Sequence, residues 1–255
     1  MNSEPELLRL VGITKSFGPV KALENVNFFI KKGECVGLVG DNGAGKSTLA
    51  KIISGAVQPD AGAMFWCGEK IVLASPSHAR ALGIEMVYQD LALCDSLTVA
   101  QNLFLGRERI SRFFIFPILK RKEIQQQAAK VLSDLKIMQV DVNKKVRDLS
   151  GGQRQAVALG RAFVTAPKLL ILDEPTAALA VGQTMRVLEV IRELKNHGVS
   201  IILISHRLQD ILETCDRVYV LYEGRVVAEH DKKEVTIELL ARLIARAKEV
   251  PIGGA

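Results

Sequence analysis

A glycine-rich segment, Gly40-Asp41-Asn42-Gly43-Ala44-Gly45-Lys46-Ser47, has the residue types and the spacing of a phosphate-binding loop. Glycines free the backbone to point its N–H groups at an anion, and the N-terminus of a following helix adds partial positive charge. A strand expected over Glu34 to Val39 and a helix expected over Thr48 to Ile53 flank it, which is the context such a loop requires. The sequence therefore predicts a nucleotide site, with Lys46 reaching the β- and γ-phosphates and the Ser47 hydroxyl binding Mg²⁺.

Two carboxylates follow an apolar run in the second half of the chain. The residues from Leu169 to Leu172 predict a strand that is buried on both faces, and Asp173 and Glu174 come directly after it. Ligands bind at the C-terminal ends of strands in α/β sheets. Asp173 is therefore a candidate for holding Mg²⁺ through water, and Glu174 for taking the proton of an attacking water. A solvated acidic pair is the alternative, which four apolar residues leading into the pair disfavour.

A second set of possible anion donors lies in Leu149-Ser150-Gly151-Gly152-Gln153, just before a helix expected over Arg154 to Phe163. A hydroxyl and several backbone N–H groups at a helix N-terminus favour negative charge. The competing interpretation is a capping turn, because serine is a preferred N-cap residue. One chain thus carries two candidate anion sites far apart in sequence.

The Leu-Ser-Gly-Gly-Gln segment after a phosphate loop resembles the signature of the ABC ATPases, and the resemblance covers nearly the whole chain. It implies that the family's nucleotide contacts are made by the phosphate loop through Thr48 and by the signature residues Ser150, Gly151, Gly152 and Gln153. Glu174 is then the catalytic base, and Ser47, Gln89 and Asp173 are the metal-binding residues.

Three further residues match family elements in order. Gln89, after a strand expected over Ile84 to Tyr88, resembles the glutamine that contacts magnesium and the attacking water. His206, after a strand expected over Ser200 to Ile204, resembles the switch histidine at the γ-phosphate. Phe17 matches the aromatic residue that stacks on adenine, with a phenylalanine of the core as the alternative.

Ala180 is a departure from the family, which usually has aspartate at this position. In the family that aspartate helps to couple the two ATP sites of a dimer. Its loss puts communication between sites in doubt, although not ATP binding.

The family resemblance also implies partners. Two subunits meet head to tail, so that Ser150 and Gly152 of one close over the ATP bound at Lys46 of the other. Because many relatives are fused tandems whereas this sequence has one ATPase unit, we expect a homodimer. In the mechanism that the resemblance implies, two ATP molecules stabilise the closed dimer and hydrolysis through Glu174 reopens it. An integral membrane permease moves with the dimer.

The segments Ser75 to Leu93 and Asn102 to Glu108 are similar to ATPase subunits of monosaccharide importers of the ribose and fructose type. That similarity implies a peripheral position on the cytoplasmic face of the membrane and, indirectly, a sugar-binding protein partner. The apolar run Phe113 to Leu119 is a candidate permease contact, because exposed apolar patches mark interfaces, with packing inside the helical block as the alternative. Rival functions are an ABC ATPase for another cargo or one that acts on nucleic acid or the ribosome.

The elements that must position these residues follow from periodicity. Short apolar runs in the first third predict an antiparallel or mixed β region, and Thr98 to Arg161 has helical periodicity. The strands around Leu169 and Ser200, with an amphipathic helix at Met185 to Lys195 between them, predict a βαβ unit. A hairpin at Val218 to Ala228 and a helix over Ile237 to Lys248 end the pattern.

The fold class is thus α/β. The family resemblance makes it a P-loop NTPase (RecA-like) core with an N-terminal antiparallel β-subdomain and an inserted α-helical subdomain. All 255 residues are expected to form a single ABC ATPase domain. Its β-subdomain and nucleotide core occupy about 1–90 and 160–255, and the helical insertion occupies about 91–160.

Composition limits the other classes of function. The net charge of +6 is spread over scattered basic pairs with few aromatic residues, which favours a solvated surface over a nucleic-acid groove, so no nucleic-acid partner is expected. The cysteines at positions 35, 67, 94 and 215 have no metal-ligand spacing and are expected to be reduced structural thiols. No N-terminal stretch resembles a signal peptide, and the longest apolar runs are too short to span a bilayer.

Overall fold

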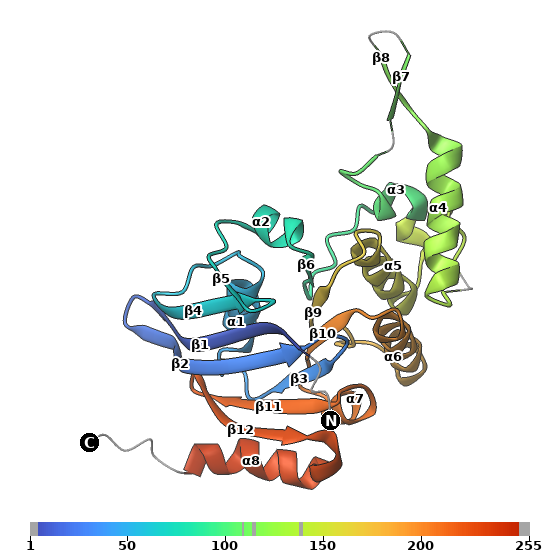
Figure 1. Cartoon of the computed structure of the whole chain (residues 1–255). Coiled ribbons are helices and arrows are strands. Elements are labelled where there is room, and N and C mark those ends of the chain that lie inside the picture. The colour runs from blue at the N-terminus through green and yellow to red at the C-terminus, as the bar shows by residue number, and fades with distance from the viewer. Residues whose placement is uncertain (1–4, 109, 114–115, 138–139, 250–255) are drawn as a thin grey trace.

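The computed structural model of the chain describes residues 5–108, 110–113, 116–137 and 140–249. Two larger sheets form the body of the molecule, a block of helices stands to one side of them, and the helix α8 (Ile237–Glu249) lies beneath the second sheet (Figure 1). In the described part of the chain, no helix combines the length and apolar character that a membrane span needs.

The first sheet is antiparallel, with strand order β2-β1-β4-β5. Its long strands alternate buried and exposed side chains, as a sheet with one face on the core requires. The expected N-terminal antiparallel region is therefore confirmed. The strands are β1 (Glu6–Phe17), β2 (Val20–Lys31), β4 (Ala61–Trp66) and β5 (Glu69–Ile71).

The second sheet has six strands in the order β12-β11-β3-β10-β9-β6, all parallel except the edge strand β12. Alternate residues of its central strands belong to two different core clusters. Leu170 and Leu172 pack into one cluster, whereas Leu169 and Ile171 pack into the other. Burial on both faces explains the continuous apolar runs in the sequence. The strands are β3 (Cys35–Val39), β6 (Ile84–Val87), β9 (Leu169–Asp173), β10 (Ser200–Ile204), β11 (Arg217–Tyr222) and β12 (Arg225–Asp231).

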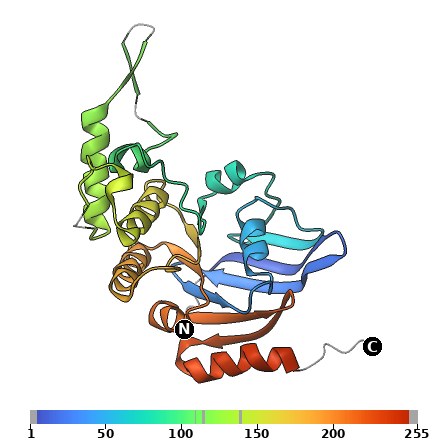
Figure 2. The ribbon, with the colours of Figure 1, turned by 180° about the vertical axis from the view of Figure 1, so that it is seen from behind.

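Helices cover both faces of the second sheet, as the view from behind shows (Figure 2). The expected βαβ unit, the late hairpin β11–β12 and the C-terminal helix are all present. The remaining helices are α1 (Lys46–Ile53), α2 (Pro76–Ala81), α3 (Val99–Leu103), α4 (Arg121–Asp134), α5 (Gly151–Phe163), α6 (Val181–Asn196) and α7 (Leu208–Thr214), with 3₁₀ turns at Val146–Asp148 and Lys232–Glu234.

The segment between α3 and α4 differs from the helical block expected over Thr98 to Arg161. The strands β7 (Ile110–Phe113) and β8 (Phe116–Leu119) pair as an antiparallel hairpin, and residues 114–115 between them lie outside the described residues. Pro117 lacks the N–H that a helix interior needs, and β-branched and aromatic residues favour strands. The hairpin projects away from α3 and α4 instead of packing among the helices (Figure 1).

The four cysteines are free thiols, as the sequence predicts. Cys35 and Cys215 are buried with their sulfurs 3.6 Å apart, and burial raises the pKa of the Cys215 thiol well above its ordinary value. Cys94 is half-buried, whereas Cys67 is exposed.

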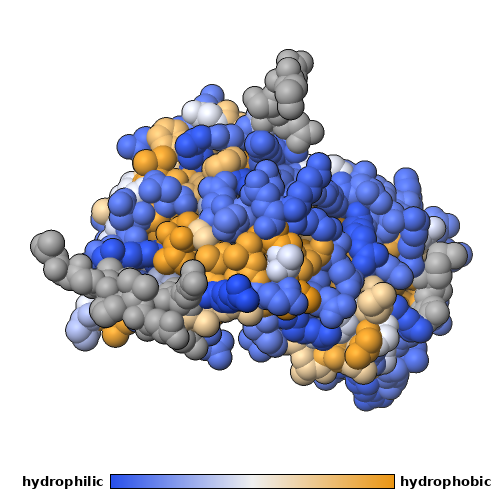
Figure 3. All heavy atoms as spheres, turned by 90° about the horizontal axis from the view of Figure 1, so that it is seen from below, coloured by the Kyte–Doolittle hydropathy of each residue, from blue (hydrophilic) through white to orange (hydrophobic). Residues whose placement is uncertain are grey.

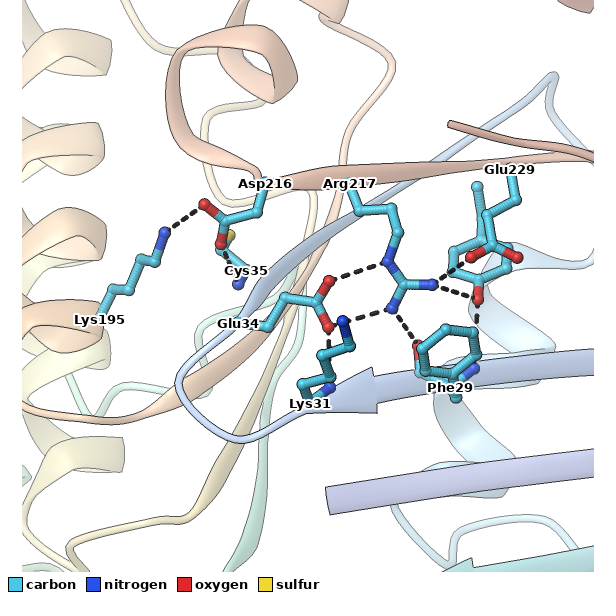
Figure 4. A network of polar contacts seen from close by, with 9 residues as sticks. Phe29, Lys31, Glu34, Cys35, Lys195, Asp216, Arg217 and Glu229 are labelled. Carbon is cyan, nitrogen blue, oxygen red and sulfur yellow. Dashed lines mark hydrogen bonds and ion pairs between the residues drawn. The ribbon is translucent and has the colours of Figure 1, made fainter. Parts of the chain in front are cut away.

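Arg217 at the start of β11 is the centre of a buried polar network at the N-terminal end of β3 (Figure 4). Its guanidinium binds the Glu34 carboxylate through Nε and Nη2, at 2.8 and 3.0 Å. Nη2 also donates to the carbonyl of Phe29 at 2.9 Å, and the group lies 3.9 Å from the centre of the Phe29 ring. Nη1 donates to the Tyr219 hydroxyl at 2.8 Å. One cation thereby ties the second sheet to β2 of the first.

We expect Arg217→Met to lower the free energy of unfolding by about 3 kcal/mol, because it leaves the Glu34 carboxylate without its cation. The two side chains are only 6% and 10% exposed. Arg225→Met is the matched control: its pair with Glu24 is 42% and 32% exposed, so the loss should stay below about 1 kcal/mol. Urea unfolding measures both, and equal losses would contradict the proposed role of burial.

Candidate functional site

The glycine-rich loop connects β3 to α1, and two of its glycines are required by close backbone contacts. Gly40 and Gly45 have φ of +148° and +103°. A Cβ on Gly40 would lie 2.2 Å from the carbonyl oxygen of Leu221, and one on Gly45 would lie 2.6 Å from that of Ala22. Only glycine fits both the backbone angle and the space. The loop therefore packs directly on β11 and β2.

Lys46, the first residue of α1, is 8% exposed and turns back into the loop. Its Nζ donates to the carbonyl oxygens of Gly40 and Asp41, at 2.7 and 2.8 Å. Burial lowers the pKa of Lys46, and the negative charges of Glu174, Asp173 and Asp41 partly offset that shift. The ammonium group thus lies inside the loop, close to carboxylates that come from another strand.

Asp173 is the last residue of β9, and the Ser47 hydroxyl lies near its carboxylate. Burial raises the pKa of Asp173, while the nearby Ser47 hydroxyl and the charges of Lys46 and Lys51 oppose the rise. Oxygen donors of this kind fit Mg²⁺, which proteins hold through one or two carboxylates together with substrate phosphates. Among the described residues, no group of three or more His, Cys, Asp or Glu side chains is placed to hold a metal.

Glu174 and His206 come from neighbouring strands and meet directly. Nδ1 of His206 lies 2.7 Å from Oε2 of Glu174, and the backbone N–H of His206 donates to the same oxygen at 3.4 Å. The backbone N–H of Glu174 donates to the carbonyl of Ile204 at 2.9 Å. Glu174 has a left-handed φ of +53°, a strained value for a residue with a side chain. Surrounding contacts therefore determine where its carboxylate lies.

A cavity of about 730 Å³ lies at the C-terminal edge of the second sheet and brings several of the predicted residues together. Gly40, Asp41, Asn42, Gln89, Glu174 and His206 line it, together with Val39, Ala177, Ser205 and Leu208. Gln89 is exposed, two residues beyond the end of β6.

The C-terminal helix also contributes to this cavity, through Ala241, Ile244 and Ala245. Seen from below, the face that carries α8 shows a band of apolar residues with polar residues around it (Figure 3). Ile244 packs on the hydrophobic core as well as lining the cavity. The helical periodicity of this segment is visible in the sequence, but nothing local indicates which part of the molecule the helix reaches.

Phe17 ends β1 with 50% of its surface exposed, so it is not a residue of the core. The Lys15 ammonium lies 5.5 Å from the centre of its ring. The ring is not part of the cavity wall at Gly40. A stacking role for Phe17 therefore remains a prediction.

The signature segment lies apart from the glycine-rich loop. Ser150 caps α5: its hydroxyl accepts from the Gln153 N–H at 3.3 Å, and the Gln153 side chain accepts from the Ser150 N–H at 3.0 Å. Ser150, Gly152 and Gln153 line a second cavity, of about 470 Å³, against Gln183 and other residues of α6. The capping interpretation is thus correct locally. Within one chain, the structure does not bring the two candidate anion sites together.

Ala180 is the N-cap of α6, the longest helix among the described residues. Its backbone has the extended angles of an N-cap, but no side-chain hydrogen bond caps the helix, and its first turn contains no acidic residue. An aspartate at this position would supply the missing acceptor. The departure seen in the sequence therefore also removes a helix cap.

Comparison with known sequences gives three consistent findings. The model of the family described as ABC transporter matches residues 23–177. The chain is 45% identical over 239 residues to the xylose/arabinose import ATP-binding protein XylG of Sulfolobus acidocaldarius, covering 94% of each chain. It is 42% identical over 255 residues to the fructose import ATP-binding protein FrcA of Rhizobium meliloti, covering 98% of each.

Solved structures agree with this result. The ADP conformation of MJ1267, an ATP-binding cassette of an ABC transporter, is similar with a TM-score of 0.80 and 31% identity, over 95% of this chain and 96% of that one. A dimeric post-hydrolysis state of the cassette MJ0796, bound to ADP and Pi, is similar with a TM-score of 0.74 and 26% identity, over 90% of this chain and all of that one.

We expect Ala180→Asp to raise the free energy of unfolding by about 1 kcal/mol, because the carboxylate can accept from the first N–H groups of α6. Ala180→Leu changes the side chain without adding an acceptor and should leave stability within about 0.5 kcal/mol. Urea unfolding of the two variants beside the parent chain measures the difference. An equal effect of Asp and Leu would show that the cap is not what this position lacks.

Proposed function

Because the chain belongs to the ABC transporter family, in which ATP-binding subunits hydrolyse ATP to drive transport, we propose that it powers a monosaccharide importer as a head-to-tail dimer. The Glu174–His206 pair, held at 2.7 Å in the cavity that the glycine-rich loop lines, is the observation that carries the proposal. The chain is then one ABC ATPase domain, with the core at about 1–90 and 160–255 and the helical insertion at about 91–160.

ATP binds with its phosphates in the loop from Gly40 to Thr48. The loop N–H groups and the N-terminus of α1 face the phosphates, and the Lys46 ammonium exchanges its carbonyl partners for phosphate oxygens. Ser47, Asp173 and Gln89 would hold Mg²⁺, which supplies positive charge to the phosphates. Stacking of Phe17 on adenine completes this mode of binding.

Hydrolysis needs a base that is fixed beside the γ-phosphate. Glu174 accepts the proton of the attacking water, and His206 holds the carboxylate through Nδ1. Gln89, on the same cavity wall, orients the water. Because these groups come from β9, β10 and β6, their spacing depends on the packing of the sheet.

Dimerisation accounts for the separation of the two anion sites. Ser150 and the residues through Gln153 lie in a different cavity from Lys46, so a head-to-tail partner supplies them to the phosphates. The dimeric structure of the related cassette MJ0796, bound to ADP and Pi, supports the formation of a dimer. Closure of the dimer on ATP and reopening after hydrolysis then drive the permease.

The cargo is proposed from the two relatives that match over almost their full length, whose names specify xylose/arabinose and fructose import. The chain then works at the cytoplasmic face of the membrane with a permease and, indirectly, a sugar-binding protein. The hairpin β7–β8 at the tip of the helical block is a candidate permease contact. The membrane protein that co-purifies with the chain distinguishes a sugar importer from an ABC system for another cargo.

Glu174→Gln should retain ATP binding and lose at least about 100-fold in ATP turnover, because an amide cannot accept the proton at neutral pH. We also expect this variant to accumulate as a dimer with ATP and magnesium. Phosphate release, a fluorescent ATP analogue and light scattering give the three measurements.

Glu69→Gln is the matched control, since Glu69 is exposed on β5 and away from the cavity. It should behave like the parent chain. A monomeric Glu174→Gln chain that binds ATP and hydrolyses it normally would contradict the proposed chemistry.

Mixing two inactive variants tests the composite site. Lys46→Ala damages the phosphate loop and Ser150→Arg damages the signature, so each homodimer has a defect in both of its sites. A heterodimer contains one intact site. Equal mixing should therefore restore up to about a quarter of the parent ATPase activity, because half of randomly formed dimers are mixed and each has one of two sites intact.

The control for this experiment is a mixture of Lys46→Ala with Glu174→Gln. These residues act in the same half of the site, so every site of every dimer keeps a defect and no activity should return. Absence of recovery in the first mixture, when an untagged variant co-purifies with a tagged one and so shows that mixed dimers form, would contradict the head-to-tail arrangement.

A further inference from the structure

A buried polar network lies directly behind the Glu174–His206 pair. Asp210, in the first turn of α7, is 2% exposed, and its Oδ2 accepts a hydrogen bond from the Thr176 hydroxyl at 2.5 Å. Thr176 is itself 1% exposed and follows Glu174 by two residues. A carboxylate is thus buried against the loop that leaves β9.

Arg207 extends the network to the other member of the pair. Its Nε lies 3.6 Å from Oδ2 of Asp210, and its Nη1 donates to the Thr184 hydroxyl on α6 at 3.0 Å. Its backbone N–H donates to the buried Ser205 hydroxyl at 3.0 Å. Because Arg207 follows His206 in sequence, Asp210 connects the segments that carry both members of the pair.

The loop after β9 needs such an anchor. Glu174 and Ala178 both have left-handed φ values, of +53° and +58°. The loop is a succession of tight turns, with the Ala177 N–H donating to the Glu174 carbonyl at 3.2 Å and the Leu179 N–H donating to the Thr176 carbonyl at 3.3 Å. Residues with side chains keep these angles only where surrounding contacts hold them. The Thr176 hydroxyl is the side-chain contact that holds this turn to α7.

Stabilisation of the fold does not by itself explain why a carboxylate is buried at Asp210. Removing a charged group from water is costly, and an apolar residue of similar size often packs as well or better. What an apolar residue cannot supply is a directional bond to Thr176 together with attraction for Arg207. The network therefore favours one relative position of two segments. One follows β9 and carries Glu174, and the other follows β10 and carries His206.

We infer that Asp210 and Thr176 are positioning residues that hold the Glu174 carboxylate against His206 in its reactive place. This rests on the proposed function, in which Glu174 accepts the proton of the attacking water. Neither residue lines the cavity, so loss of their bond should change turnover while leaving nucleotide binding intact.

The test replaces Thr176 by valine, which has nearly the same size and no hydroxyl, and by serine, which keeps the hydroxyl. We expect Thr176→Val to lower kcat by about tenfold or more, since small misplacements of reacting groups cost this much, with the affinity for a fluorescent ATP analogue within about twofold of the parent. Thr176→Ser should return kcat to within about threefold of the parent.

Thr214→Val is the matched control. Thr214 is also buried, and its hydroxyl donates to the backbone carbonyl of Asp210 rather than to the carboxylate. It should lower stability in urea as Thr176→Val does, without the fall in kcat. A kcat that falls equally in both valine variants, or that does not return with serine, would assign the network a merely structural role.

Two further variants separate this inference from the proposed function. Asp210→Asn keeps an acceptor for Thr176 but loses the charge that attracts Arg207. Combining it with Thr176→Val should lower kcat by less than the product of the two single effects, because both variants weaken the same network around Asp210. If Glu174→Gln is inactive while Thr176→Val turns over normally, only the positioning role is wrong. If Glu174→Gln is fully active, the proposed chemistry fails first.

Discussion

The parallel pairing of β3, β10 and β9 is the constraint on which the rest of the molecule depends. Ile204 of β10 pairs with Leu38 on one side and with Asp173 on the other, so the three strands end at nearly the same level. Each is followed at once by a segment of the site. The glycine-rich loop, His206 and Glu174 therefore lie at one edge because the backbone hydrogen bonds of the buried sheet hold the three strands in this register.

Strain and close contact are concentrated at this edge. Gly40 and Gly45 allow the loop to lie against β11 and β2, where any side chain would collide with a carbonyl. Glu174 has no such freedom and takes a left-handed angle with a full side chain. Contacts from β10 and α7 hold the backbone at that angle: the Glu174 N–H donates to Ile204, and Thr176 donates to Asp210. The position of the Glu174 carboxylate therefore depends on two neighbouring elements.

Charge is distributed differently at the two ends of the sheet. At the N-terminal end, the cation of Arg217 is paired with Glu34 and enclosed by Phe29 and Tyr219, so its bonds are complete within the chain (Figure 4). At the C-terminal end, the hydrogen-bond partners of the Lys46 ammonium within the described part of the chain are two neutral carbonyl oxygens, those of Gly40 and Asp41. Such bonds can be exchanged for stronger ones to an anion. The charged group at the N-terminal end therefore holds the two sheets together, whereas the one at the C-terminal end can exchange its partners for an anion.

The sequence by itself predicted the candidate residues of the site and most of the fold. Three local patterns carry this information: the spacing from Gly40 to Ser47, the acidic pair after Leu172 and the signature at Ser150. A local pattern can be recognised without knowledge of the fold. Only the tertiary structure decided that Glu174 meets His206, that α8 reaches the cavity, that Phe17 is exposed and that Thr176 is held by Asp210. The hairpin within the helical block was missed because short apolar runs do not distinguish strand from helix. Each of the other facts depends on contacts between residues far apart in the chain, and periodicity and spacing contain no information about such contacts.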